Sequence, residues 1–275
     1  MAIVPTTEII VGIIIIAILS TLSIRFRAID VSGTICGAII CLVTLFAGGL
    51  SWLAVIIAFV LISSILTRYR YSYKQEIESA QEKGGQRSWQ NTLANGLVGG
   101  VAAVLEIVTH DSIYSIVYLS SIAGAMSDTI ATEIGLLSNS KPRLIANLRK
   151  VVVQGTSGAV SGLGELAGLI SAAGLAGLGL ATGVVSGTGV HLALGYVAVV
   201  SGAFLGMNFD SLLGASVQGR NKCRVCGKQT EELMHHGERT ISESGIRYFE
   251  NNVVNLVSTV AAAVISAVIF LMFVS

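Results

Sequence analysis

The sequence is poor in charge. Only 12% of its 275 residues are Asp, Glu, Lys or Arg, whereas a soluble domain carries about 25%. This composition excludes a disordered chain, a nucleic-acid-binding surface and an ordinary cytosolic enzyme. The net charge is only +1, so it implies no partner, and the position of the few charged residues carries the information.

Three further features are missing. No Lys or Arg precedes Arg25, and Glu8 comes before the first apolar run. A secretory signal peptide begins with a positive segment, so we expect a retained helix here. No Gly-x-x-x-x-Gly-Lys-Ser/Thr occurs, which excludes a P-loop nucleotide site. Cysteines are few, and Cys36 and Cys41 lie within an apolar run where we expect them to pack.

Long apolar runs dominate what is present. Because one bilayer crossing takes about 20 apolar residues, we predict an all-α, polytopic integral membrane protein with a single transmembrane domain over residues 1–275. The sequence predicts about eight transmembrane helices, near Ile9–Ile24, Val31–Ala47, Trp52–Leu66, Asn91–Val108, Ile113–Met126, Val151–Ala172, His191–Phe209 and Val253–Val274.

The basic residues are sorted to one face. All 17 of them fall in clusters at 25–27, 68–87, 141–150 and 220–247, and eight crossings put these clusters on the same side. Cytoplasmic loops carry an excess of Lys and Arg. We therefore expect this face to be cytoplasmic, with loops near 67–90, 127–150 and 218–251, and both termini on the other side.

Aspartates lie at the same membrane depth as these clusters. Asp128 and Asp210 lie at the cytoplasmic ends of the fifth and seventh spans, and Asp30 precedes the second. Ionisable groups at a membrane edge are costly and often functional, although helix capping is an alternative for Asp30 and Asp128. Glu133 is about 140° around an ideal helix from Asp128, so the two share a site only if the helix breaks. Glu165 is expected inside the sixth span, towards the opposite face.

Other polar residues point to phosphate chemistry. Hard oxygen ligands next to cations are what Mg²⁺ and nucleotide phosphates require. Asparagines begin the fourth and eighth spans, and Lys141 and Arg143 follow Asp128. The Gly-rich stretch Gly155-Thr156-Ser157-Gly158 fits close helix packing or, at a helix start, phosphate binding by backbone N–H groups. The sequence predicts a polar pocket at the cytoplasmic face, which these asparagines and one more suggest: Asn91, Asn95, Asn251, Asn252, Asn255 and Asn208.

Several motifs resemble the transmembrane protein 19-like family over nearly the whole chain. They are Ser127-Asp-Thr-x-Ala-Thr-Glu-x-Gly135, Lys141-Pro-Arg-Leu-Ile145, Gly155-Thr-x-Gly158 and Asp210-Ser-Leu-Leu-Gly-Ala-x-x-Gln218. That family includes the chloroplast phytyl-phosphate kinase of tocopherol synthesis. The resemblance implies a kinase that converts a prenyl (phytyl or geranylgeranyl) monophosphate in the bilayer to the diphosphate, with CTP as phosphoryl donor and Mg²⁺ as cofactor.

The resemblance also implies roles for single residues. Asp128, Lys141, Arg143 and Asp210 would be catalytic, and Asp128, Glu133 and Asp210 would hold Mg²⁺. The remaining set would bind the nucleotide and phosphates: Asn95, Gly155, Thr156, Ser157, Ser161, Asn252 and Asn255. The prenyl tail would lie between helices.

A second metal site is suggested by Cys223-x-x-Cys226 followed by His235-His236. These are ligand types of structural zinc sites. The family pattern leads us to expect His-Cys in place of the two histidines, and adjacent histidines seldom both ligate one ion. A reduced, metal-free loop is the alternative.

Other functions remain open at this point. A cytidylyltransferase making a CDP-linked lipid is the nearest enzymatic alternative. A small-molecule transporter should have its polar site near the membrane midplane between repeats, and a scaffold would not explain the aligned polar residues. The small-residue faces could also pack between chains as a homo-oligomer.

Overall fold

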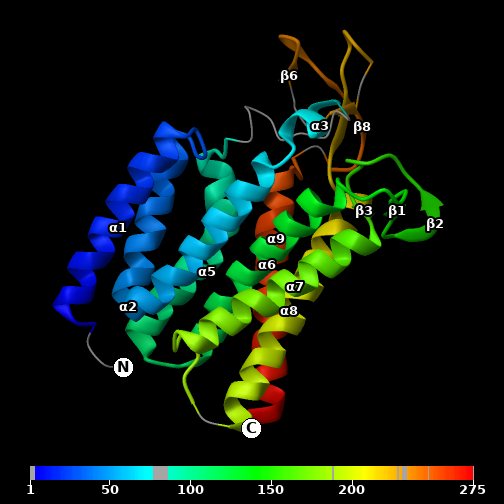
Figure 1. Cartoon of the computed structure of the whole chain (residues 1–275). Helices are drawn as coiled ribbons and strands as arrows, with labels where there is room; N and C mark the ends of the chain where they lie inside the picture. The colour runs from blue at the N-terminus through cyan, green and yellow to red at the C-terminus, as the bar shows by residue number, and fades with distance from the viewer. Residues whose placement is uncertain are drawn as a thin grey trace.

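The protein is a bundle of long helices with short strands at one end (Figure 1). The computed structural model describes residues 4–76, 86–187, 189–227, 229–230, 234–246 and 248–274. Its helices are α1 (Thr6–Arg25), α2 (Val31–Arg68), α3 (Tyr71–Glu76), α5 (Trp89–Thr109), α6 (Ile113–Gly135), α7 (Gly162–Ala181), α8 (Val190–Ser216) and α9 (Asn251–Val274).

Helix α2 is a hairpin of two antiparallel halves. Gly48 and Gly49 leave the helical conformation, and Gly49 has φ +65° and ψ −153°. Leu45 and Leu53, on either side of this reversal, meet in one apolar cluster with Ile16 of α1. A left-handed backbone of this kind favours glycine, which has no Cβ. The two predicted spans at 31–47 and 52–66 are therefore the two arms of α2.

The number of crossings agrees with the sequence. Six of the described helices are long and apolar enough to cross a membrane, and α2 crosses twice. Helix α6 is the further crossing. It is less apolar because it lies at the centre, packed against α2, α5, α7, α8 and α9, so its small and polar residues meet protein instead of lipid. Among the described residues this makes eight crossing segments.

Close packing holds the centre together. A Cβ on Gly124 of α6 would lie 2.9 Å from the Cβ of Ala262 on α9, so these two helices approach more closely than larger residues allow. On the other side of α6, Tyr118 stacks on Trp52 with ring centroids 4.2 Å apart. The Tyr118 hydroxyl donates to the Trp52 carbonyl at 2.6 Å, which ties α6 to α2.

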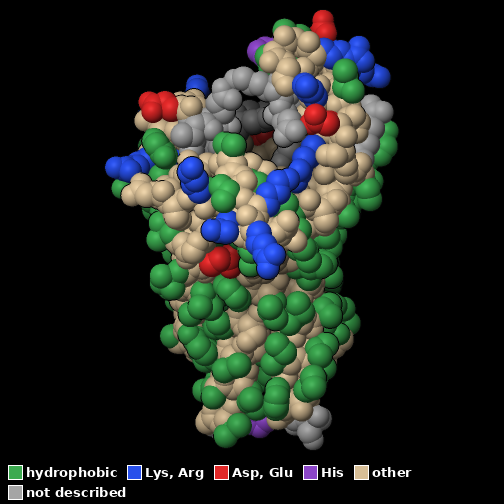
Figure 2. All heavy atoms as spheres, turned by 90° about the vertical axis from the view of Figure 1, so that its right-hand side faces the viewer, with side chains coloured by type: hydrophobic (Ala, Val, Ile, Leu, Met, Phe, Trp, Pro, Cys, Tyr) green, Lys and Arg blue, Asp and Glu red, His purple; other side chains and the backbone are tan. Residues whose placement is uncertain are grey.

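The outer surface separates apolar from charged residues. Figure 2 shows hydrophobic side chains over the lower body of the visible face and Lys and Arg gathered towards the upper end. On α1 the exposed residues include Ile10, Ile14 and Ile18. This is the surface of a helical protein whose body lies in hydrocarbon.

The loops contain short strands, which an all-α prediction missed. They lie with α3 at the end away from the start of α1 and the end of α9 (Figure 1), so both ends of the chain are at the other end of the bundle. The strands form a sheet β2-β1-β3, a sheet β5-β4-β8 and a pair β6-β7. Their bounds are β1 Arg143–Leu144, β2 Asn147–Val151, β3 Ala159–Val160, β4 Arg220–Lys222, β5 Gln229–Thr230, β6 Met234–His235, β7 Glu238–Arg239 and β8 Ile241–Ser244.

The sixth span begins later than predicted. Residues 151–161 form β2, a turn and β3, and α7 starts only at Gly162. The reason is local, because Gly155 (φ +81°) and Gly158 (φ +77°) are left-handed and cannot belong to a right-handed helix. Ser161 is the N-cap of α7 and accepts the Gly164 N–H at 3.1 Å. Because α6 continues to Gly135, the loop expected at 127–150 covers 136–161 instead.

Candidate active site

A polar cavity of about 220 Å³ lies at the strand-bearing end of the bundle. Its walls come from the start of α5, the last turns of α6, the turn between β2 and β3, the first turn of α7, the second half of α8 and the start of α9. Segments more than 100 residues apart in sequence therefore meet at one site.

Two carboxylates line this cavity. Asp128 of α6 and Asp210 of α8 both line it and are close enough to repel each other electrostatically. The hydroxyl of Ser258 on α9 donates to Asp210 Oδ2 at 2.9 Å. The Asn255 amide is oriented so that its nitrogen faces acceptors. This nitrogen donates to the same Asp210 oxygen and to the Asn251 carbonyl, both at 3.2 Å. Helix α9 thus holds the Asp210 carboxylate in place.

The turn between β2 and β3 forms another wall. Gly155, Thr156 and Ser157 line the cavity, as does Ser161 at the start of α7. The Ser157 hydroxyl is within hydrogen-bond distance of Gln218 Oε1 (2.6 Å) and the Gly214 carbonyl (3.1 Å). These contacts fix the turn against the end of α8. The sequence placed this stretch at a helix start, but it is a turn between strands.

Only some of the predicted asparagines line the cavity. Asn95 of α5 and Asn255 of α9 line the cavity, together with Asn91 and Asn251. Asn252 does not line it. The difference follows from the helix: Asn251 and Asn255 are four residues apart and share a face of α9, whereas Asn252 points about 100° away from Asn251.

Lys141 and Arg143 do not reach the cavity. Both are exposed, and Arg143 Nη1 donates to the Leu148 carbonyl at 2.7 Å within the hairpin of β1 and β2. Their nearness to Asp128 in sequence suggested a shared site. The two additional turns of α6 and the strand geometry of β1 instead direct them to the surface.

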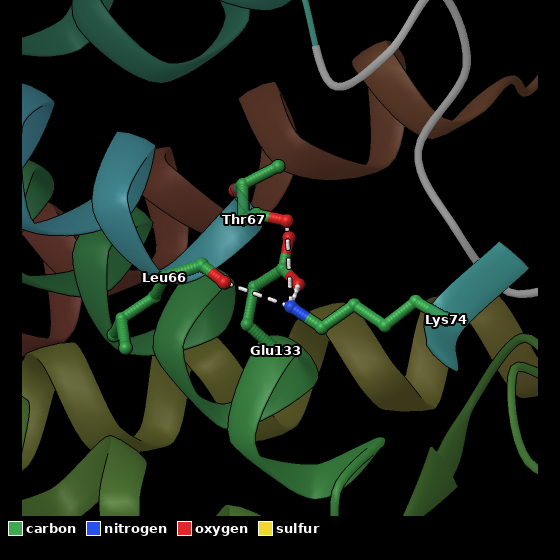
Figure 3. A network of polar contacts seen from close by, with 4 residues as sticks. All are labelled: Leu66, Thr67, Lys74 and Glu133. Atoms are coloured by element: carbon green, nitrogen blue, oxygen red, sulfur yellow. Dashed lines mark hydrogen bonds and ion pairs between the residues drawn. The ribbon is translucent and has the colours of Figure 1, made fainter. Parts of the chain in front are cut away.

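Glu133 belongs to a buried ion pair and does not line the cavity. Figure 3 shows its carboxylate against Lys74 Nζ of α3, at 2.5 Å. Lys74 is 1% exposed and also donates to the carbonyls of Leu66 (2.8 Å) and Thr67 (3.4 Å) at the end of α2. Because α6 does not break after Asp128, Glu133 stays on another face. Its role here is to join α3 and α2 to α6.

Asp30 is a helix cap, the alternative considered from the sequence. Its carboxylate accepts the Gly33 N–H at 2.7 Å and the Ser32 hydroxyl at 2.6 Å at the start of α2. It does not line the cavity.

Four cavity residues were missed from the sequence. Arg87 and Gln154 gave no signal that separates them from other loop residues. Gln218 closes the motif that begins at Asp210, but nothing in the motif assigns it a role. Glu165 was expected near the opposite face, yet the later start of α7 puts it in the first turn, where it lines the cavity.

The proposed zinc ligands are only partly placed. Cys223 Sγ accepts backbone N–H groups of Val225 (3.3 Å) and Cys226 (3.5 Å), and neither cysteine forms a disulfide. The His235 side chain lies outside the described residues. Within the described part of the chain no three His, Cys, Asp or Glu side chains come together as metal ligands. Because this excludes the His235 side chain, the zinc site stays a prediction.

Residues 14–263 match the family described as integral membrane protein DUF92. The chain belongs to this family. A membrane protein of Methanocaldococcus jannaschii, described as uncharacterized, is 33% identical over 74% of this chain and 81% of its own length. Protein PGR of Arabidopsis thaliana is 29% identical over 96% of both chains. Protein VTE6, a chloroplast protein of the same plant, is 28% identical over 46% of this chain and 41% of its own length. No solved structure matches the chain.

Proposed function

We propose that this protein is a CTP-dependent prenyl-phosphate kinase that converts a prenyl monophosphate to the diphosphate at the cytoplasmic membrane face. The proposal rests on one observation above all: Asp128 and Asp210 face a polar cavity whose other wall is a Gly/Ser/Thr turn. The resemblance of these motifs to the prenyl-phosphate kinase family, and the likeness to protein VTE6, support it.

The residues present fit Mg²⁺. Two carboxylates that repel each other in a partly buried cavity are stabilised when a divalent cation lies between them. Mg²⁺ is usually bound by one or two carboxylates together with waters and substrate phosphates, and Asp128 and Asp210 are such a pair. When bound, Mg²⁺ would neutralise the charge that the phosphates bring. Glu133 is not part of this set, because it is paired with Lys74.

The turn between β2 and β3 supplies groups for a nucleotide. Gly155, Thr156 and Ser161 line the cavity together with the aspartates. Their arrangement allows several donors to contact phosphate oxygens. Asn95 and Asn255 also line the cavity and carry side-chain amides.

The reaction requires little covalent help. An oxygen of the prenyl monophosphate attacks the γ-phosphorus of CTP, the bond from that phosphorus to the β–γ bridging oxygen breaks, and CDP leaves. The acceptor phosphate is already ionised near neutral pH, so no strong base is needed. Catalysis is then positioning and charge stabilisation, which the rigid helices α6, α8 and α9 provide.

The test uses the purified full chain in detergent with Mg²⁺, geranylgeranyl or phytyl monophosphate, and CTP labelled at either the α- or the γ-phosphate. We expect γ-label, and no α-label, in a prenyl diphosphate. Transfer of α-label would identify a cytidylyltransferase instead, and no transfer of label from CTP or ATP would reject the kinase assignment.

Asp128→Asn tests the site. It keeps the shape of the side chain and removes the charge, and we expect kcat/KM to fall about 100-fold or more, as for loss of a group that stabilises transition-state charge. Asp111→Asn is the matched control, because Asp111 is exposed in the turn between α5 and α6 and lies outside the cavity. Equal activity of the two variants would contradict the role of Asp128.

A further inference from the structure

Arg87 is a buried cation at the edge of the polar cavity. It is 8% exposed, and of the Lys and Arg side chains that the structure describes it alone lines the cavity. Its guanidinium lies over the ring of Phe59 on α2, 5.4 Å from the centroid. This contact covers one face of the planar group and leaves its N–H donors along the edge.

The Arg87 guanidinium has no hydrogen-bond acceptor among the residues that the structure describes. Both backbone polar groups of Arg87 are hydrogen-bonded: its N–H donates to the Ala28 carbonyl (3.1 Å), and its carbonyl accepts the Asp30 backbone N–H (2.9 Å). An arginine held in this way by its backbone and by an aromatic ring indicates that its donors serve a ligand.

The carboxylate that acts on Arg87 is shared with another cation. Glu133 is the carboxylate that acts on it electrostatically, yet Glu133 is already paired with Lys74 at 2.5 Å. One carboxylate thus faces two buried cations. Burial lowers the pKa of Arg87, and the charge of Glu133 only partly raises it again. A phosphate oxygen in the cavity would give the Arg87 guanidinium an anionic hydrogen-bond partner of its own.

Gln218 also lines the cavity and carries a buried donor group. Its side chain is 4% exposed, and its Oε1 is 2.6 Å from the Ser157 hydroxyl. That contact orients the amide so that Oε1 is used. The Nε2 group is buried and has no hydrogen-bond partner among the described residues. It therefore remains as a fixed donor at the end of α8.

From these observations we infer that Arg87 and Gln218 bind the phosphate group of a phosphoryl ligand in the cavity. Arginine suits this role because its fork of N–H groups matches phosphate oxygens, and the amide adds a neutral donor that selects for an acceptor oxygen. The inference rests on the proposed function for its ligands. A prenyl monophosphate and the triphosphate of CTP carry the same chemistry, and the experiment separates them.

The test measures dissociation constants of the purified full chain for two probes separately, geranylgeranyl monophosphate in mixed micelles and Mg²⁺-CTP. Arg87→Lys keeps the positive charge and removes the forked pair of guanidinium N–H donors. Gln218→Glu keeps an acceptor for Ser157 and replaces the donor by a carboxylate oxygen. We expect each variant to weaken binding of at least one probe tenfold or more. The probe that is weakened identifies the phosphate bound by these residues.

Matched controls are Arg149→Lys on β2 and Gln75→Glu on α3, both exposed and outside the cavity. They should stay within twofold of the parent for both probes. Thermal unfolding without ligand shows whether each variant folds, and Gln218→Glu carries the test if Arg87→Lys does not fold. Parent-like affinity for both probes in the folded variants would overturn the inference.

Failure of this inference is distinguishable from failure of the proposed kinase activity. If the parent transfers γ-label and the folded variants bind and transfer equally well, the kinase stands and the role of Arg87 and Gln218 is rejected. If the parent transfers no label while both variants weaken binding of a phosphate probe, the phosphate site stands and the kinase is rejected.

Discussion

Gly158 is the point where the turn between β2 and β3 touches α8, and Gly158→Ala tests whether that contact shapes the site. A Cβ at this position would lie 2.5 Å from the Cβ of Ala215 and 2.6 Å from the Ser211 carbonyl. Ser211 directly follows Asp210, so any shift there moves the carboxylate. The residue is also left-handed, at φ +77°.

The size of the effect follows from two costs, that of the left-handed backbone and that of the close contacts. A non-glycine residue in the left-handed region costs about 1–2 kcal/mol, and overpacking against neighbours that cannot rotate away costs about 1–3 kcal/mol. Together they disfavour the docked turn by about 2–5 kcal/mol. Since about 1.4 kcal/mol is a factor of ten, the ratio of docked to undocked turn should fall roughly thirtyfold or more.

The assay is kcat/KM for γ-label transfer, with thermal unfolding in parallel. Gly162→Ala is the control, because Gly162 is the first residue of α7 and an added Cβ meets no atom within 4 Å. We expect the control to keep full activity and Gly158→Ala to lose at least about tenfold, in line with the loss of docking. If the two variants are equally active, the docked turn is not required and the reasoning is wrong.

Two predictions concern stability, both measured by thermal unfolding in detergent. Lys74→Met should lower the free energy of unfolding by about 3–5 kcal/mol because it leaves the Glu133 charge buried and unpaired. The double variant Lys74→Met with Glu133→Leu should recover most of this loss, and the control Lys150→Met should change stability little. If Lys74→Met is as stable as the parent, the ion pair contributes nothing to stability. Tyr118→Phe should lower the free energy of unfolding by about 1 kcal/mol through the lost hydrogen bond to the Trp52 carbonyl. The control Tyr114→Phe should leave stability unchanged, because the Tyr114 hydroxyl bonds to no described residue. Equal melting temperatures of the two variants would refute the role of the Tyr118 hydrogen bond.

The spans could be predicted because their signal is local. Apolar runs of membrane length and the grouping of basic residues are properties of composition, and each run became a helix or an arm of α2. The boundary at 151–161 failed since apolar content does not distinguish strands and a turn from a helix. Gly155 and Gly158 were noted, but their left-handed conformation depends on how the turn packs against α8.

The sequence predicted part of the candidate site. Asp128 and Asp210 stood out as acids at a membrane edge, and the structure brings them to one cavity. Lys141, Arg143 and Glu133 were grouped with Asp128 by nearness in sequence, which is a poor guide on a helix, where five residues turn about 140°. Arg87 was one basic residue among five in its cluster, and nothing local separated it from the others.

The sequence alone determined the class of protein, the crossings, the common depth of the two aspartates and the family, because hydrophobic burial and charge placement in a membrane act on each segment independently. Only the tertiary structure decided which charges meet. Glu133 is paired with Lys74, and Arg87 is left buried beside a polar cavity. Such pairings depend on the rotation and packing of helices far apart in the chain, and neither quantity is encoded in any single segment.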